Sequence, residues 1–155
     1  MAANVINGTD LCLFLSDGTG TTKKCIALAT TCKLTVNMST RAIASKDSGI
    51  WAESAVGRMN WTVDSDQLFT QDWTTGAEAS GYTYDILMDL MIARTAITIT
   101  LGKVTTDGMG YQQTLGSDKT LIGSAFINKI DLNAPDNANS SYTITLEGNG
   151  ALTHA

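Results

Sequence analysis

The alternation that decides the fold runs through residues 31–38, which read TCKLTVNM. Every second residue is apolar, and a period of two is typical of a half-buried β-strand. The same period returns at residues 59–64 (MNWTVD), 97–101 (ITITL) and 142–147 (YTITLE). The polar partner is often threonine, which combines a β-branched side chain with an uncharged surface. The sequence therefore predicts a mainly β chain.

Three other stretches also read as strands. Asp10 to Leu15 and Cys25 to Ala29 are apolar runs on either side of turn residues that include Gly18-Thr19. Leu121 to Leu132 is long enough for one bent strand. A hairpin that turns at Gly18-Thr19 places Cys12 opposite Cys25.

One segment departs from the β pattern and predicts a helix over residues 82–93. Asp85 and Asp89 stand four residues apart and form a narrow polar stripe, whereas Tyr84, Leu87, Met88 and Met91 share another face. This arrangement is typical of a short helix that packs on a sheet.

Two stretches fit neither strands nor the helix. Residues 39–57 carry both charge signs together with Ile50 and Trp51, and we expect a long loop there. A loop of roughly 19 residues in so small a domain commonly serves an interaction. Residues 103–119 are rich in glycine, which predicts a flexible hairpin or loop.

Length and charge narrow the class of protein. The 155 residues of 16.4 kDa fit a single domain over 1–155. The formal net charge is −5, and only 16% of residues are charged, compared with roughly 25% in an ordinary soluble domain. Proteins that bind nucleic acid through its phosphates depend on clustered Lys and Arg, so the composition disfavours a nucleic-acid-binding protein. We see no signal peptide and no membrane-spanning stretch, and expect synthesis in the cytoplasm.

Catalytic chemistry is poorly represented. The only histidine is His154, and the sequence contains no GxSxG, HExxH or phosphate-loop motif. Cys12, Cys25 and Cys32 have no metal-ligand spacing and are expected to be buried thiols. Asp64 and Asp66 read as two solvated acids on one face of a strand. We therefore expect a protein that is not an enzyme and uses no cofactor or metal.

The stretch from Thr35 to Phe69 resembles a known family. The sequence SKDSGIWAE at 45–53 is followed by Gly57 and by WTVDSDQLF at 61–69. This spacing resembles the major tail tube proteins of long-tailed bacteriophages. The opening run GTDLCLFL at 8–15 also looks like the first strand of that family. Gln67 is a departure, because such sequences often have glycine after the aspartate.

The resemblance implies an antiparallel β-sandwich or barrel-like subunit that forms hexameric rings. Stacked rings make the tail tube of the virion, a conduit for double-stranded DNA, which passes without specific binding. Other tail proteins are implied as partners: a tape measure, a terminator and a baseplate or tip. The loop 39–57 would reach a neighbouring subunit, and the residues expected in that contact are Ile43, Lys46, Asp47, Ile50, Trp51 and Glu53.

The acidic balance fits a conduit, because a cationic lumen would hold DNA through counterion release. Asp64 and Asp66 are the candidates for an acidic lumen or surface. Two alternatives stay open. One is the inner tube of a contractile tail or injection system, and the other is a carbohydrate-binding β-sandwich that uses Trp51 and Trp73 as platforms.

Overall fold

The structure is a computed structural model that describes residues 5–6, 8–16, 23–25, 29–47, 49–69, 82–105, 114–115 and 119–154. Within these ranges it contains one α-helix, one 3-10 turn and nine strands. In chain order the elements are η1 (Gly8–Asp10), β1 (Leu11–Ser16), β2 (Lys24–Cys25), β3 (Ala29–Ile43), β4 (Glu53–Leu68), α1 (Tyr84–Ile92), β5 (Ile97–Thr105), β6 (Thr114–Leu115), β7 (Leu121–Asn133), β8 (Ser141–Gly148) and β9 (Thr153–His154).

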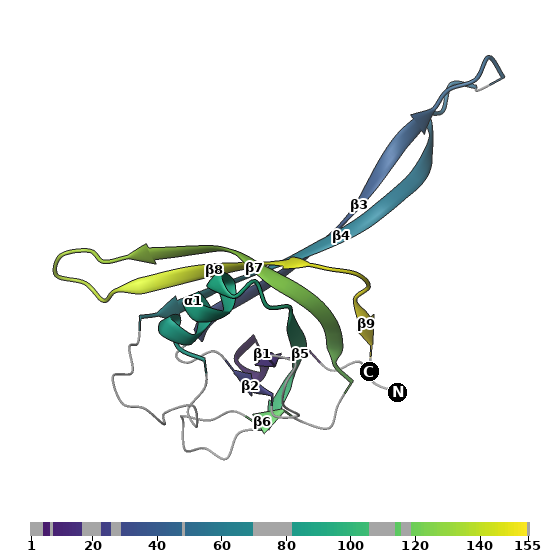
Figure 1. The fold of residues 1–155 in the computed structure, drawn as a ribbon. Coiled ribbons are helices and arrows are strands. Elements are labelled where there is room, and N and C mark those ends of the chain that lie inside the picture. Colours follow the sequence, from purple (N-terminus) through teal and green to yellow (C-terminus); the bar gives the residue numbers. More distant parts are fainter. Residues whose placement is uncertain are drawn as a thin grey trace.

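The strands form one antiparallel sheet in the order β2-β1-β5-β7-β8-β4-β3, with β6 added to β5 and β9 added to β7. β7 pairs with β5 through residues 121–125 and with β8 through residues 125–133. Because of this change of partner the sheet turns back over itself, and Figure 1 shows β1, β2 and β5 beneath β8 and β4. The predicted mainly β fold with one short helix is confirmed, and so is the single bent strand over 121–132.

The core lies between these two layers. Leu15 of β1, Ile99 of β5 and Ile144 of β8 are at most 1% exposed. In β8 the buried residues stand at alternate positions, so the period of two carries one face of that strand into the core. In β1, by contrast, residues 13–16 are all buried. The opposite face of β4 and β8 is polar.

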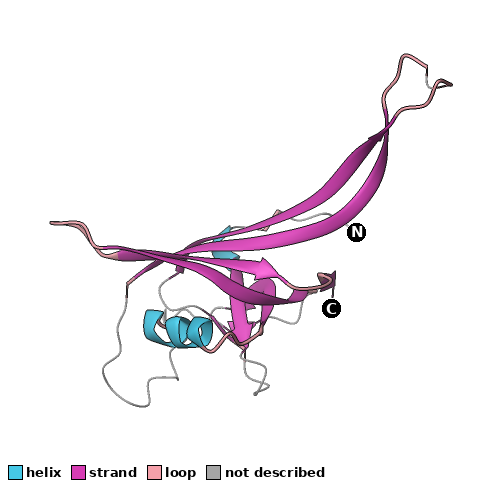
Figure 2. Cartoon of the chain, turned by 45° about the horizontal axis from the view of Figure 1, so that its top comes forward, coloured by secondary structure: helices cyan, strands magenta, loops and turns pink. Residues whose placement is uncertain are grey.

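The helix is two residues shorter at its start and one residue shorter at its end than the predicted 82–93. Thr83 has extended backbone angles (φ −100°, ψ 170°), so the helix begins only at Tyr84. Leu87 is fully buried against the sheet. The ring of Tyr84 also packs at 5.2 Å from Phe69 and 5.4 Å from Tyr142, between ring centroids. Figure 2 shows the helix under the sheet, where it closes one side of the core.

The predicted loop over 39–57 is wrong at both ends. β3 continues to Ile43 and β4 begins at Glu53, and the two strands pair as far as Ile43↔Glu53. The connection is therefore only residues 44–52. The alternation fades in this part of the sequence because a register shift interrupts it in β4 and no part of the described core covers it.

Two other predicted boundaries need correction. Residues 103–105, expected in a loop, belong to β5. The odd-numbered apolar alternation ends at Leu101, but the strand continues, and Val104 is only 6% exposed. β6 pairs antiparallel with β5, and the rest of 103–119 up to residue 118 lies outside the described residues. Phe14, not Cys12, stands opposite Cys25, because the register of β1 with β2 is shifted by two residues. Gly18-Thr19 and residues 26–28 lie outside the described residues.

Candidate assembly surface

A two-stranded arm leaves the body of the molecule. β8 pairs with β4 only from Thr62 to Leu68, so the remaining part of β4 is bonded to β3 alone. We call residues 36–60 the arm and the rest of the described chain the body. Figures 1 and 2 show the arm extending far beyond the body. Among the described residues, burial of its side chains is therefore limited to the arm's own two strands.

Trp61 fixes the root of the arm. Its side chain is 4% exposed, and its indole Nε1 donates a hydrogen bond of 3.0 Å to the carbonyl oxygen of Gly150. The ring lies so close to Gly123 that an added Cβ would stand 2.6 Å from it, and Gly148 is approached at least as closely. The arm is thus anchored by a large side chain set against two glycines of β7 and β8.

The two faces of the arm differ in polarity. The face on the core side of the sheet, which we call the apolar face, consists by register of Val36, Met38, Thr40, Ala42, Ser54, Val56 and Met59. It carries no charge, and its large side chains are exposed by 48% (Val36), 49% (Met38), 71% (Val56) and 67% (Met59). The opposite face, which we call the polar face, includes Arg41, Arg58 and Glu53 together with Asn37 and Asn60.

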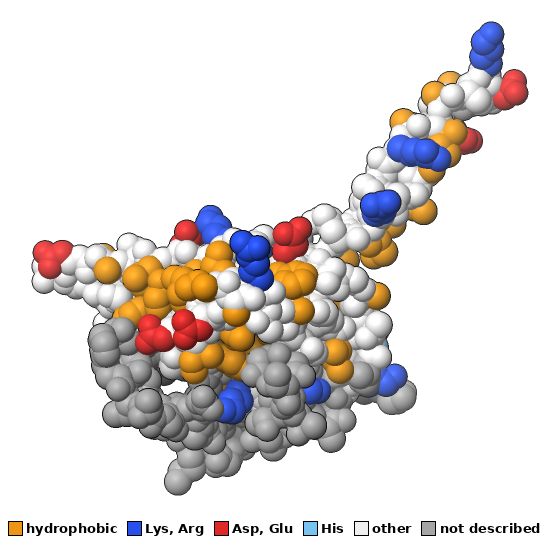
Figure 3. Space-filling model, viewed as in Figure 1, with side chains coloured by type: hydrophobic (Ala, Val, Ile, Leu, Met, Phe, Trp, Pro, Cys, Tyr) orange, Lys and Arg blue, Asp and Glu red, His pale blue; other side chains and the backbone are white. Residues whose placement is uncertain are grey.

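The alternating sequence predicts that Met38 and Met59 are half-buried strand residues. It does not show that the side chains of the core bury β4 only from Trp61 onward. Figure 3 shows hydrophobic and basic side chains along the arm. Isolated exposed apolar residues are ordinary on protein surfaces, whereas a contiguous set marks an interaction site. The apolar face of the arm is such a set, and sequence reasoning missed it.

The predicted contact residues all lie at the far end of the arm. Ile43 and Glu53 are paired at the ends of β3 and β4, and Lys46 and Asp47 stand in the turn beyond them. Ile50 and Trp51 are 96% and 81% exposed. The structure thus brings these six residues into one region at the tip, without showing what they contact. Trp73, the other proposed sugar platform, lies outside the described residues.

Asp64 and Asp66 lie on the polar side of the sheet in the body. The Oδ1 of Asp66 accepts a hydrogen bond of 2.7 Å from the Thr143 hydroxyl, and its Oδ2 accepts one of 2.9 Å from Thr31. Asp64 accepts from Thr145 at 2.9 Å. Threonines on the neighbouring strands therefore hold both carboxylates in place.

The surface around these two acids carries both charge signs. By register, Lys33, Lys129, Asp131 and Glu147 share it with Asp64 and Asp66. Lys129 forms an exposed ion pair of 3.1 Å with Asp131, and Glu147 accepts a hydrogen bond of 3.3 Å from the Asn128 amide. We call this surface the acidic face, because its acids outnumber its lysines.

The three cysteines are half-buried and form no disulfide. Burial, with smaller contributions from Cys12 and Asp64, raises the pKa of Cys32 to about 11. Burial, with Cys25 and Asp10, also raises the pKa of Cys12. Both thiols are therefore protonated at neutral pH, and a protonated thiol is a poor nucleophile and metal ligand.

Among the described residues, no three His, Cys, Asp or Glu side chains gather as they would around a metal ion. In that part of the chain no helix has the length and apolar character needed to cross a membrane.

The same fold occurs in several solved assemblies. A chain in the virion of a native gene transfer agent particle superposes with a TM-score of 0.70 at 18% identity, over 97% of this chain and 99% of that chain. The SPP1 tail tube gives 0.68 at 11% identity, over 97% and 78%. The baseplate of the anti-feeding prophage gives 0.64 at 8% identity, over 100% and 97%. At these identities the likeness concerns the fold.

Sequence comparison defines the family. No curated protein matches the chain. The family model described as phage tail tube protein matches residues 5–154, which is nearly the entire sequence. The chain is therefore a member of the phage tail tube protein family.

Proposed function

We propose that copies of this chain form stacked rings of six that build the wall of a tail tube in a virion, through which double-stranded DNA passes. Family membership and the fold shared with assembled tails support this function. One similar structure is a tail with six-fold symmetry (TM-score 0.70, 20% identity). The tube would join other tail proteins, such as a tape measure, a terminator and a baseplate or tip.

The observation that carries the proposal is the arm. Its apolar face and its tip expose Met59, Ile50 and Trp51 to solvent by 67% or more. A monomer gains nothing from a long two-stranded extension of this kind, because an isolated hairpin is marginally stable in water. Contact with a neighbouring copy would bury these side chains, and an exposed tryptophan is a frequent anchor of such contacts.

The sheet also has an open edge on the outer side of β3, which has no partner other than β4 among the described strands. Long free edges invite pairing with another chain, and closure into a ring removes them. An array of identical copies thus accounts for both the arm and the edge.

Assembly can be tested with Trp51→Ala, using Ile92→Ala as the control. Ile92 is also apolar and 70% exposed, but it lies at the end of α1 rather than on the arm. We expect Trp51→Ala to leave the thermal unfolding curve unchanged and to abolish tubes in negative-stain micrographs, while Ile92→Ala forms tubes. Normal tubes from Trp51→Ala would remove the tip from the contact.

The lumen proposal concerns the acidic face, which would line the DNA path with a net negative surface. Glu147→Lys reverses one charge there, and Asp89→Lys makes the same change on α1. We expect particles with Glu147→Lys to assemble and to eject DNA more slowly, because a cation on the path attracts phosphate. Equal ejection rates for the two variants would place the acidic face elsewhere than the lumen.

The chain of the anti-feeding prophage baseplate supports a second candidate of the same kind, the inner tube of a contractile tail or injection system. Both candidates use the same arm and the same ring. A neighbouring gene for a sheath protein would favour the contractile version.

A further inference from the structure

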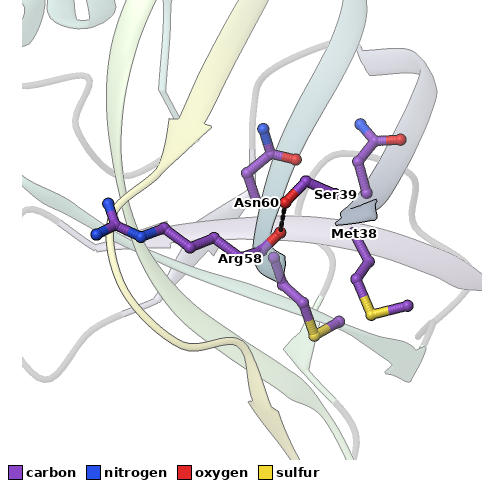
Figure 4. A pocket seen from close by; sticks show the side chains of 6 residues that line it. Met38, Ser39, Arg58 and Asn60 are labelled. Carbon is purple, nitrogen blue, oxygen red and sulfur yellow. Dashed lines mark hydrogen bonds between the residues drawn. The ribbon is translucent and has the colours of Figure 1, made fainter. Parts of the chain in front are cut away.

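β4 contains one residue more than β3 in the middle of the arm. Met38 pairs with Met59, and the next pair in the ladder is Thr40 with Val56. Over this step β3 advances by two residues and β4 by three. Gly57 and Arg58 therefore both face Ser39, which is the arrangement of a β-bulge. The Ser39 hydroxyl donates a hydrogen bond of 3.2 Å to the carbonyl oxygen of Arg58, and this bond is drawn in Figure 4.

The bulge decides which face of the arm each side chain joins. In a regular strand, residues three apart point to opposite faces. Val56 and Met59 are three apart, yet both stand on the apolar face, because the bulge absorbs the extra residue. If β4 kept all its residues but paired with β3 without a bulge, the apolar face would be divided between the two sides of the hairpin.

Gly57 is required at the bulge for space. An added Cβ would overlap the Ser39 hydroxyl oxygen and stand 3.0 Å from the Ser39 carbonyl oxygen. The second contact is with backbone, so it cannot be relieved by rotation of a side chain. Gly8, in the body and outside the arm, has no atom within 4 Å of such a Cβ. Gly8 therefore serves as the control for Gly57.

A hollow of about 410 Å³ accompanies the bulge and is lined by Asn37, Met38, Ser39, Arg58, Met59 and Asn60. Figure 4 shows the Arg58 side chain extending away from Met38. Bulges bend the strand that carries them and increase its twist. The step at Gly57 therefore also sets the direction in which the outer half of the arm continues.

We propose that Gly57 and Ser39 are positioning residues for assembly, which keep the apolar face continuous and direct it onto a second copy of this chain. The inference rests on the proposed function. The apolar face lies on the core side of the sheet, and the polar face of the arm continues the acidic face. A copy that covers the apolar face therefore leaves the acidic face open, as a DNA conduit requires.

The test compares Gly57→Ala with Gly8→Ala in the full chain. We expect Gly57→Ala to raise the critical concentration for tube formation by about tenfold or more, since ~1.4 kcal/mol of lost contact energy has that effect. Gly8→Ala should polymerise like the original chain, and both variants should unfold at the same temperature as it does. Equal critical concentrations for the two variants would overturn the proposal.

Deletion of Gly57 separates the effect of the bulge on the direction of the arm from its effect on the apolar face. When Gly57 is removed, Arg58 stands opposite Ser39 and Val56 stays opposite Thr40, so the apolar face is intact and only the bend is lost. We expect this variant to form no tubes, or tubes with a different helical twist by electron cryomicroscopy. Tubes with the original twist would refute a role of the bulge in directing the arm.

Ser39→Ala removes the hydroxyl that donates to the Arg58 carbonyl oxygen and leaves Gly57 in place. It should also raise the critical concentration, and an unchanged value would contradict the role given to Ser39. If the unaltered chain forms no tubes even at high concentration, the proposed function fails, and this inference fails with it. If the unaltered chain forms tubes and the Gly57 variants assemble just as well, the proposed function stands and this inference alone is wrong.

Discussion

β4 passes from the arm into the body without a change in its alternating pattern, yet its two halves have opposite surroundings. Val63 in the body is 1% exposed, whereas Met59, on the same side of the same strand, is 67% exposed. β8 and the opposite layer of the sheet cover the first, and no described part of this chain covers the second. Trp61 stands at the boundary.

The comparison separates two roles of an apolar side chain. In the body it contributes to the stability of the monomer, because its burial removes apolar surface from water during folding. In the arm the same residue type remains in water after folding, so its burial can only contribute to binding. Substitutions on the two sides of Trp61 should therefore change different measured quantities.

The largest effect is expected at the boundary itself. Trp61→Ala removes the ring packed between Gly123 and Gly148 and leaves the Gly150 carbonyl without its indole donor. Loss of a buried Phe or Trp typically lowers the free energy of unfolding by about 3–5 kcal/mol. We expect a loss in this range by urea denaturation monitored by circular dichroism. The matched variant Trp51→Ala should change the same quantity by less than about 0.5 kcal/mol, because surface substitutions rarely do more.

If Trp61→Ala and Trp51→Ala lower the free energy of unfolding by the same amount, the distinction between body and arm is wrong. If instead Trp51→Ala lowers the free energy of unfolding more than Trp61→Ala does, Trp51 packs against other residues of the monomer in solution.

A smaller effect on folding, with a large effect on assembly, is expected within the arm. Val56→Ser combined with Met59→Ser places two hydroxyls on the apolar face, 71% and 67% exposed in the monomer. The free energy of unfolding should change by less than about 1 kcal/mol, since two surface substitutions each contribute about 0.5. The fraction of protein that sediments as tubes should fall sharply. The control is the double variant Arg41→Ser with Asn60→Ser, on the polar face. Equal sedimentation of the two double variants would contradict a role of the apolar face in assembly.

The same comparison explains how far the sequence predicts this molecule. Residues 59–64 and 142–147 locate their strands, because alternation depends only on which face is apolar. The pattern does not say what covers that face, and for Met59 the cover belongs to no described part of this chain. The pattern misses residues 53–57 because the bulge at Gly57 breaks the period of β4. It misses residues 39–43 because Thr40 and Ala42 stand where large apolar side chains would mark the face.

The candidate site is predictable to a similar degree. The position of Trp51 between two strands and the motif that contains it indicated the tip of the arm, which the structure places 81% exposed. The apolar face needed coordinates, because Val56 and Met59 are three residues apart and cannot be assigned to one face from a period of two. That odd spacing in an alternating strand was the available signal of a bulge.

The smallest effect concerns a thiol and changes no stability. Cys32 lies on β3 within the body, and Met38→Cys would place a second thiol on the same side of the same strand within the arm. Burial raises the pKa of Cys32 to about 11, so its alkylation rate should keep rising with pH towards that value. A thiol at position 38 is half exposed and should titrate near the ordinary pKa of about 8.5.

At pH 8 the introduced thiol should therefore be alkylated roughly two-hundredfold faster than Cys32, because pKa values of about 8.5 and about 11 give thiolate fractions that differ by about that factor at this pH. Mass spectrometry of peptides from the variant, with Cys12 and Cys25 replaced by serine, gives both rates in one sample. Assembly should then slow the reaction at position 38 and leave that of Cys32 unchanged, since only the arm acquires a new neighbour. Protection of Cys32 on assembly, without protection at position 38, would mean that copies meet through the body, and the arm would lose its place in the contact.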